Sequence, residues 1–255
     1  MKRAIILAAA IVLIAGMAAT PALAADATAA IDINSAYVWR GLTFNDGAVV
    51  QPSIDVAAEN GLGINVWGNY DISDYDDTLD EDEFSEVDLT ISYGFSVGKL
   101  DIGAGVIEYL FPATDAAGTG NGIGSNYTAT TELYISLGMP IVGGLSASLD
   151  IYYDIDLYDD FTYAAFGLSY AYDFNDKLSL EAGASAGYAG EDFAVANGGT
   201  DGGLYDYRLS LSLGYSINDA WSVTASINYT DTLDEDHLPE QDTDTFGGIS
   251  VAYAF

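Results

Sequence analysis

Hydrophobic and polar residues alternate along nearly the whole chain. The clearest example is the segment 245–255, where Ile249, Val251, Tyr253 and Phe255 alternate with glycine, serine and alanine. A period of two residues is the signature of a β-strand whose two faces meet different surroundings. Similar runs recur, separated by Asp-Gly, Asn-Gly, Asn-Asp or Gly-Gly pairs typical of tight turns, or by longer acidic or glycine-rich connections. The chain is therefore expected to be all-β.

Twelve such runs can be counted. The expected strands are 31–43, 50–56, 62–70, 86–95, 100–111, 132–137, 145–155, 166–174, 178–188, 205–217, 221–229 and 245–255. The alternation in 100–111 is too weak to assign a face, and 31–43 is unusually long, so ten or fourteen strands stay compatible with the pattern. An even number of antiparallel strands, with short turns at one end and long loops at the other, predicts a transmembrane up-and-down β-barrel over residues 25–255. Both termini should then lie at the short-turn, periplasmic end.

The same alternation would suit a soluble β-sandwich or a lipocalin-like barrel with its apolar face inside. Two features favour the membrane barrel, with the apolar face outside. The apolar faces carry almost no charge, whereas acidic residues sit repeatedly on the other face. Aromatic residues such as Tyr93, Phe95 and Trp221 concentrate near strand ends, as in the interfacial girdles of membrane barrels.

Residues 1–24 have the three parts of a secretory signal peptide. Lys2 and Arg3 precede an apolar run, and Ala22-Leu23-Ala24 forms a small-residue cleavage site. The alternative, a retained membrane anchor, is disfavoured because the apolar run is shorter than the ~20 residues that a spanning helix needs. The mature chain is therefore expected to begin at residue 25, outside the cytoplasm. It has no cysteine and so no disulfide to stabilise it.

The chain is strongly acidic, with 6 lysine and arginine residues against 39 aspartate and glutamate residues. Such a charge repels phosphates and excludes nucleic acid as a partner. Extreme acidity often accompanies disorder, but here 50% of the residues are hydrophobic and 19 are tyrosine, which disordered chains lack. The composition therefore indicates an acidic, exported and folded β protein.

Two segments resemble known families. The segment Ser35-Ala36-Tyr37-Val38-Trp39-Arg40-Gly41-Leu42, followed by Gln51-Pro52-Ser53-Ile54-Asp55-Val56, resembles the opening of the TorF-type putative porins of Gram-negative bacteria. The end of the chain, with Tyr253 and a final Phe255, is similar to the C-terminal strand of outer-membrane barrels. In those proteins the final aromatic residue is part of the signal that the barrel-assembly machinery recognises. These resemblances imply location in the cell outer membrane, contact with its lipid and lipopolysaccharide, and a channel function.

The sequence offers little for catalysis. His237 is the only histidine, and no serine lies in a recognisable nucleophile context. A zinc or redox site is disfavoured by one histidine and no cysteine. The acidic segment 74–83 has oxygen ligands that could hold Ca²⁺ or Mg²⁺, but it lacks the spacing of an EF-hand, and a solvated surface loop is the simpler interpretation. We expect no enzyme, no cofactor and no dedicated metal site.

The inner face of the predicted barrel carries the candidate functional residues. The expected pore-lining residues are Arg40, Asp55, Trp67, Asp88, Glu132, Asp150, Glu181, Asp206 and Arg208. A buried, unpaired arginine would be costly, so each arginine should either have a carboxylate partner or face water. A structural network of salt bridges that fills the lumen is as good an interpretation as a pore.

Twelve strands lie between the eight that side chains can fill and the sixteen or more that leave a wide channel. The leading hypothesis is a narrow, passive channel for small solutes whose acidic lumen prefers cations. The alternative is a non-conducting structural or surface-exposed barrel with acidic, ion-binding loops. A substrate-specific channel should place Trp67, Tyr134 and Tyr152 at a constriction beside Arg40 or Arg208, whereas a structural barrel should have a plugged lumen.

Overall fold

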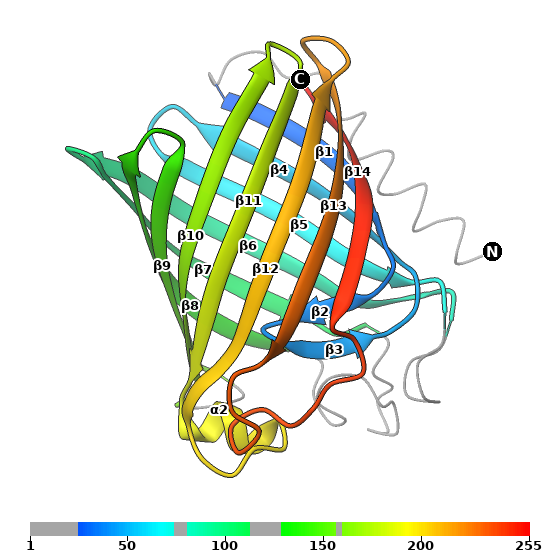
Figure 1. The fold of residues 1–255 in the computed structure, drawn as a ribbon, viewed down its shortest axis with the longest axis vertical. Helices are drawn as coiled ribbons and strands as arrows, with labels where there is room; N and C mark the ends of the chain where they lie inside the picture. Colours follow the sequence, from blue (N-terminus) through cyan, green and yellow to red (C-terminus); the bar gives the residue numbers. More distant parts are fainter. Residues whose placement is uncertain (1–24, 74–80, 113–128, 157–159) are drawn as a thin grey trace.

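The computed structural model describes residues 25–73, 81–112, 129–156 and 160–255, which form a closed barrel of twelve antiparallel strands (Figure 1). The barrel strands are β1 (Ala25–Asn34), β4 (Val49–Ala58), β5 (Leu62–Asp71), β6 (Glu83–Val97), β7 (Leu100–Leu110), β8 (Ala129–Val142), β9 (Leu145–Asp154), β10 (Thr162–Asn175), β11 (Leu178–Ala189), β12 (Gly203–Ser216), β13 (Trp221–Thr232) and β14 (Thr245–Ala254). The ring closes because β1 pairs with both β4 and β14, which leaves no free sheet edge. The predicted twelve-stranded barrel is confirmed. The expected signal peptide, residues 1–24, lies outside the described residues.

The two ends of the barrel differ in their connections. At one end, which also holds the C-terminus, the strands are joined by turns of two to four residues (Figure 1). Gly61, Gly98 and Gly143 adopt positive φ angles in three of these turns, and the Asn175 side chain accepts bonds from the backbone of the next turn residues. At the other end the connections are longer, and the one between β11 and β12 carries the short helix α2 (Glu191–Ala196). No helix in the described ranges is long and apolar enough to cross a membrane.

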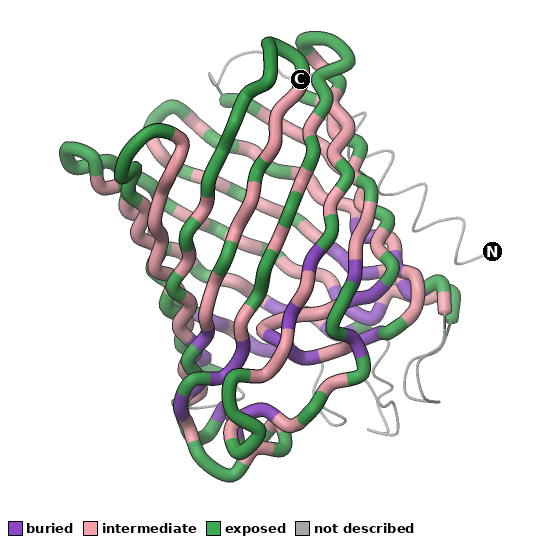
Figure 2. The backbone as a smooth tube through the Cα atoms, in the orientation of Figure 1, coloured by how far each residue is buried: buried purple, intermediate pink, exposed green. Residues whose placement is uncertain are grey.

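Large apolar side chains face the outside of the barrel. Along β12, for example, Leu209, Leu211 and Leu213 are 44–50% exposed, and exposed and partly buried positions alternate along the strands (Figure 2). The resulting apolar belt covers many strands and is far larger than the apolar patches of soluble monomers. This arrangement confirms the predicted orientation, with bulky apolar residues outside and small or acidic residues inside.

The structure also settles the orientation of β7, whose sequence pattern was ambiguous. Ala104 and Val106 are exposed on the outside, whereas Ile107 and Tyr109 face the lumen. Outside, Glu108 accepts a hydrogen bond of 2.6 Å from the Thr131 hydroxyl of β8. Because apolar residues occupy both faces of this strand, and a carboxylate lies on the outer one, the alternation could not reveal its two sides.

The prediction of one long strand over 31–43 was wrong. The first barrel strand begins earlier, at Ala25, and ends at Asn34; beyond it, β2 (Tyr37–Trp39) and β3 (Leu42–Asn45) pair only with each other. Arg40 and Gly41 join them with φ angles of 49° and 80°, the two successive positive values that a tight hairpin turn requires. We call residues 37–45 the lumen hairpin, because its side chains contact the inner faces of the barrel strands.

Near the long-loop end the lumen hairpin contributes to a buried apolar cluster. Its members, which come from the hairpin, from β10 to β12, from α2 and from the connection before β14, are Leu42, Tyr163, Ala189, Phe193, Ala194, Tyr205 and Leu238. Figure 1 shows β2 and β3 within the ring of strands and α2 beyond its end. This buried core occupies part of the lumen, whereas the apolar outer surface of the barrel remains uncovered.

Candidate functional site

Three polar contacts fasten the lumen hairpin to one side of the barrel wall. The Tyr37 hydroxyl donates to Glu86 of β6 at 2.8 Å, and the Asn45 amide donates to Asp71 of β5 at 2.7 Å. Between them, Arg40 forms a two-pronged pair with Glu132 of β8 at 2.8 and 2.7 Å. All three acceptors are carboxylates with almost no exposure to solvent. The acidic residues of the inner wall thus act first as anchors for the hairpin.

The Arg40–Glu132 pair is buried among aromatic rings. The two side chains are 7% and 6% exposed, and the guanidinium carbon lies 4.1 Å from the ring centre of Trp39 and 4.3 Å from that of Tyr152. Tyr109 adds a hydrogen bond of 2.8 Å to Glu132. Burial alone would lower the pKa of Arg40, but the charge and hydrogen bonds of Glu132 outweigh it and raise that pKa above its usual value. Arg40 therefore has the carboxylate partner that we expected from the sequence for a buried arginine.

Tyr37, at the other end of β2, is held as a neutral donor. Its burial, together with the charges of Glu86 and Asp88, raises the pKa of the phenol well above its usual value. The hydroxyl therefore keeps its proton and continues to donate to Glu86 throughout the physiological range of pH.

The tip of the hairpin reaches the opposite side of the barrel. A Cβ atom on Gly41 would lie 2.6 Å from the Cβ of Asp206 on β12 and 2.8 Å from a methyl group of Leu238, so only glycine fits. Asp206 is itself buried and accepts a 2.8 Å hydrogen bond from Tyr163 of β10. The lumen hairpin therefore spans the lumen, from anchors on β5, β6 and β8 to a close contact on β12.

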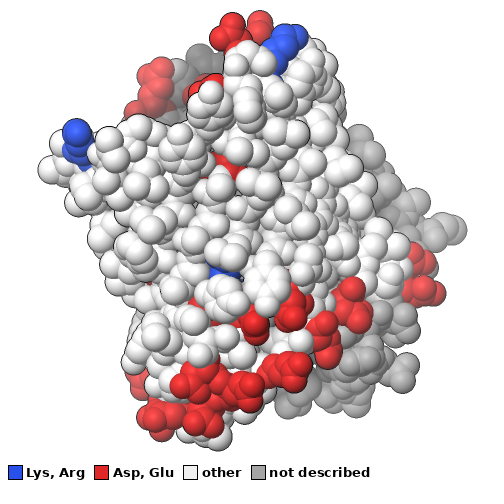
Figure 3. All heavy atoms as spheres, viewed as in Figure 1, with Lys and Arg blue, Asp and Glu red and all other residues white. Residues whose placement is uncertain are grey.

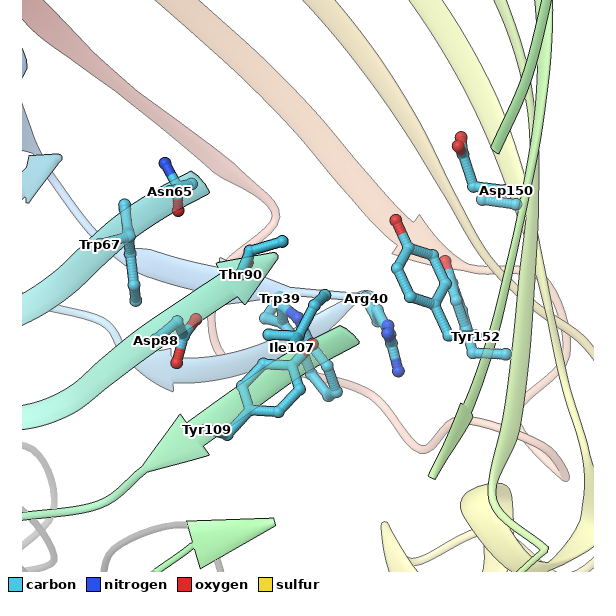
Figure 4. Close-up of a pocket in the computed structure, with 12 residues that line it drawn as sticks. Trp39, Arg40, Asn65, Trp67, Asp88, Thr90, Ile107, Tyr109, Asp150 and Tyr152 are labelled. Carbon is cyan, nitrogen blue, oxygen red and sulfur yellow. The ribbon is translucent and has the colours of Figure 1, made fainter. Parts of the chain in front are cut away.

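A cavity of about 360 Å³ remains between the hairpin and the wall (Figure 4). Trp39 and Arg40 of the hairpin border it, and Trp67 on β5 and Tyr109 on β7 supply further aromatic surface. In Figure 4, Asp88 lies on one side of this space and Asp150 and Tyr152, both on β9, lie on the other. One Asp88 oxygen is buried and accepts no hydrogen bond from the described part of the chain. The cavity thus combines aromatic walls with two carboxylates.

The structure separates the predicted pore-lining residues into three groups. Four border the cavity, namely Arg40, Trp67, Asp88 and Asp150. Glu132 and Asp206 lie directly behind it, bound to Arg40 and Tyr163. Asp55, Glu181 and Arg208 lie elsewhere on the inner face.

These last three have partners or surroundings of their own. Arg208 donates to the Asn228 side chain at 2.8 Å, and its guanidinium carbon lies 5.1 Å from the ring centre of Phe246. Asp55 accepts a 2.7 Å bond from Asn65. Glu181 is exposed and pairs in register with Ser212.

The expected aromatic constriction is present in part. Trp67 and Tyr152 border the cavity beside Arg40, and Tyr134 packs on Tyr152 with 5.9 Å between the ring centres. Sequence reasoning missed the contributions of Tyr109 and Tyr163, which the topology brings next to the hairpin. The same reasoning had no means of placing α2, whose Phe193 packs against Trp39 at 5.9 Å.

Two other candidates have less to offer. His237 is partly buried, and its ring lies 2.8 Å from the Leu204 carbonyl oxygen and against Gly203. These contacts hold the connection before β14 against β12. In the described ranges, no group of three or more histidine, aspartate or glutamate side chains is placed to hold a metal ion. Of the acidic segment 74–83, residues 74–80 lie outside the described residues.

The proposed assembly signal lies at the short-turn end, on the outer surface. Tyr253 packs between Trp221 and Phe255, with 4.8 and 4.9 Å between ring centres, and Phe255 is about half exposed. These rings form one aromatic patch at the edge of the apolar belt. Recognition by the assembly machinery stays a prediction.

Solved structures with a similar fold include several outer-membrane channels. The KdgM porin matches with a TM-score of 0.56 and 12% identity, covering 89% of this chain and 99% of its own. An outer membrane channel from Pseudomonas putida F1 matches with a TM-score of 0.56 and 10% identity, covering 93% and 97%. The NanC porin matches with a TM-score of 0.54 and 10% identity, covering 88% and 98%. At such low identities these likenesses show the fold alone.

The closed barrel and its apolar belt indicate a β-barrel that spans a membrane, as the sequence predicted, and its fold is similar to that of the outer-membrane channels named above. No curated protein matches the chain. One family profile does, over residues 18–250. The chain belongs to this family, Gcw_chp, which is described as a bacterial protein of unknown function.

Proposed function

We propose that the barrel is a channel through which small solutes diffuse passively across the outer membrane, with a preference for cations. The observation that carries this proposal is the cavity of about 360 Å³ left beside the lumen hairpin. The part of the inner wall formed by β11 to β13 supports it, because side chains such as Gly183, Ser210 and Ser226 are too small to fill a barrel of this size. The hairpin would narrow the path and set the size of the solutes that pass.

The charges of the lumen support the preference for cations. Arg40 of the hairpin is paired with Glu132, and Arg208 of the inner wall is bound to Asn228, so both arginines of the described residues are engaged. Asp88 and Asp150 border the cavity. Figure 3 shows acidic side chains gathered around the long-loop end, where they would concentrate cations at the mouth. The two lysines of the described residues, Lys99 and Lys177, lie in the short turns at the opposite end.

The test is planar-bilayer recording on the refolded mature chain. We expect discrete conductance steps and, under a salt gradient, a reversal potential of the sign that cation permeation produces. The variant Asp88→Asn/Asp150→Asn should reduce this selectivity, whereas Lys99→Gln, a substitution in an exposed turn, should not. A folded protein without conductance, or one that prefers anions, would overturn the proposal.

The second candidate is a non-conducting structural barrel. The observation in its favour is the buried cluster around Phe193 and Leu238, which occupies part of the lumen at the long-loop end. Swelling of liposomes distinguishes the two functions. A channel admits small neutral and cationic solutes into the vesicles, and a plugged barrel excludes all of them.

A further inference from the structure

We propose that the cavity beside the lumen hairpin is a binding site for a small organic cation, one that carries a guanidinium or ammonium group. The inference rests on the proposed channel function, of which it specifies the substrate class. It depends on three features of the cavity: its aromatic walls, its two carboxylates and its size.

The aromatic walls already hold a cation that belongs to the chain itself. The guanidinium of Arg40 lies over the rings of Trp39, Tyr152 and Tyr163, at 4.1, 4.3 and 4.8 Å from their centres. Such distances are those of cation–π contacts, in which the negative face of a ring attracts a positive charge. The rings of Trp67 and Tyr109 extend this aromatic surface into the open part of the cavity. A second, mobile cation would find there the same type of surface that Arg40 uses.

The carboxylates select the charge of the ligand. Arg40 is neutralised by Glu132, and so it offers no net positive charge to an anion in the cavity. Asp88 keeps one buried oxygen without a donor from the described residues, and Asp150 borders the same space. A carboxylate oxygen accepts hydrogen bonds, and a positive charge beside Asp88 would stabilise its ionised form, so the natural partner is a cationic ligand with N–H donors. A positive N–H group also supplies the charge that a neutral sugar would lack.

The size of the cavity favours a small ligand. Its volume of about 360 Å³ is near the lower end of the roughly 300–1,000 Å³ that small-molecule sites usually have. In the view of Figure 4, Asp88 and Asp150 lie on either side of Arg40. An elongated ligand with a positive group at each end could contact both carboxylates and lie along the rings between them.

Tryptophan fluorescence gives a direct test of binding, which does not require conduction. Two of the three tryptophans, Trp39 and Trp67, border the cavity, and the third, Trp221, faces outward at the short-turn end. The probe is agmatine, which carries a guanidinium and an ammonium group and no carboxylate. We expect a saturable change in the emission of the refolded protein. The variant Asp88→Asn/Asp150→Asn should weaken binding by about a hundredfold, because it removes the charge from two hydrogen-bond acceptors and each factor of ten corresponds to about 1.4 kcal/mol.

The control variant is Glu181→Gln, which also removes a carboxylate from the inner face but lies away from the cavity. It should bind agmatine as the wild type does. Heat-modifiable migration in gels verifies that each variant has folded. If sucrose, a neutral saccharide, produces an equal change that the double variant retains, the cavity recognises sugars and the inference is wrong.

Bilayer recording separates the site from the channel. If the protein conducts but agmatine neither blocks the current nor alters the emission, the site does not exist and the channel proposal stands. If agmatine binds in a manner that depends on Asp88 and Asp150 but no current is seen, the site stands and the channel proposal fails. Brief blocking events that disappear in the double variant would support both.

Discussion

The pair between Arg40 and Glu132 should hold the lumen hairpin across the lumen, and the substitution Arg40→Met tests this role. Methionine keeps an unbranched apolar chain among the surrounding rings but removes the charge and both hydrogen bonds. The barrel itself closes through strand pairs that do not involve the hairpin, because β2 and β3 pair only with each other. We therefore expect the barrel to fold and the hairpin to detach.

The magnitude follows from the burial of the pair. Its side chains are 7% and 6% exposed, and removal of one partner from a buried pair typically costs about 3–5 kcal/mol because the other charge is left uncompensated. Among the side chains that the structure describes, Tyr109 alone would still donate a hydrogen bond to Glu132. At 1.4 kcal/mol for each factor of ten, the ratio of docked to undocked hairpin should fall by about two to three and a half orders of magnitude.

Single-channel recording measures the consequence. With the hairpin undocked, the lumen should be wider, and the Arg40→Met protein should show a larger mean conductance with more current noise than the wild type. The double variant Arg40→Met/Glu132→Gln removes the stranded charge as well and should recover part of the docked population. Lys99→Met, in an exposed turn, should behave as the wild type.

Wild-type conductance and noise in a folded Arg40→Met protein would refute this reasoning. The hairpin would then be held by the contacts of Tyr37 and Asn45 or by the apolar cluster around Leu42. In that case the pair would be a local feature of the cavity and not the main anchor of the hairpin.

Four further outcomes are expected. Gly41→Ala should also raise the conductance, because the added Cβ would lie 2.6 Å from a neighbouring Cβ at a residue with a φ of 80°. This strain should destabilise the docked hairpin by about 1–3 kcal/mol. Tyr37→Phe should lower the unfolding temperature, measured as the temperature at which the folded band disappears from gels. The buried carboxylate of Glu86 on β6 loses its hydrogen-bond donor, which should cost about 1–3 kcal/mol of stability. The cation selectivity proposed for Asp88 and Asp150 should weaken in reversal-potential measurements between 0.1 and 1 M salt, since the screening length falls from about 10 to about 3 Å. Phe255→Ser should reduce the amount of protein in outer-membrane fractions without preventing refolding in detergent, if the terminal aromatic residue is an assembly signal.

The barrel strands could be predicted because their two faces meet different surroundings. Over residues 208–213 of β12, leucine on the outside alternates with arginine or serine on the inside, and the twelve-stranded count follows from such runs. Prediction failed where the lumen itself is apolar. On β7, Ile107 and Tyr109 face inward next to the hairpin, so that neither face stands out by its polarity.

The candidate site could be predicted only in its residue types. Period-two alternation placed Asp88, Glu132 and Asp150 on the inner face, but it carries no information on which of them approach each other. Arg40 and Glu132 are 92 residues apart in the chain, and they meet because the hairpin turns into the lumen beside β8. Strand register and loop path, which depend on the whole barrel, decide which carboxylates become anchors and which border the cavity.

The segment that resembles the TorF-type porins takes on a different meaning in the structure. Read as a strand, 31–43 places Tyr37 and Trp39 on the lipid-facing side, because aromatic residues near strand ends usually lie there. The structure contradicts this interpretation, because the chain leaves the barrel wall after Asn34 and the tight turn at Arg40-Gly41 then pairs β2 with β3 inside the lumen. Once inside, Tyr37 binds Glu86, Trp39 packs on Arg40, and Gly41 allows the contact with β12. The first part of this sequence, residues 35–42, therefore contributes to the hairpin that narrows the lumen, whereas the second part, residues 51–56, lies in barrel strand β4.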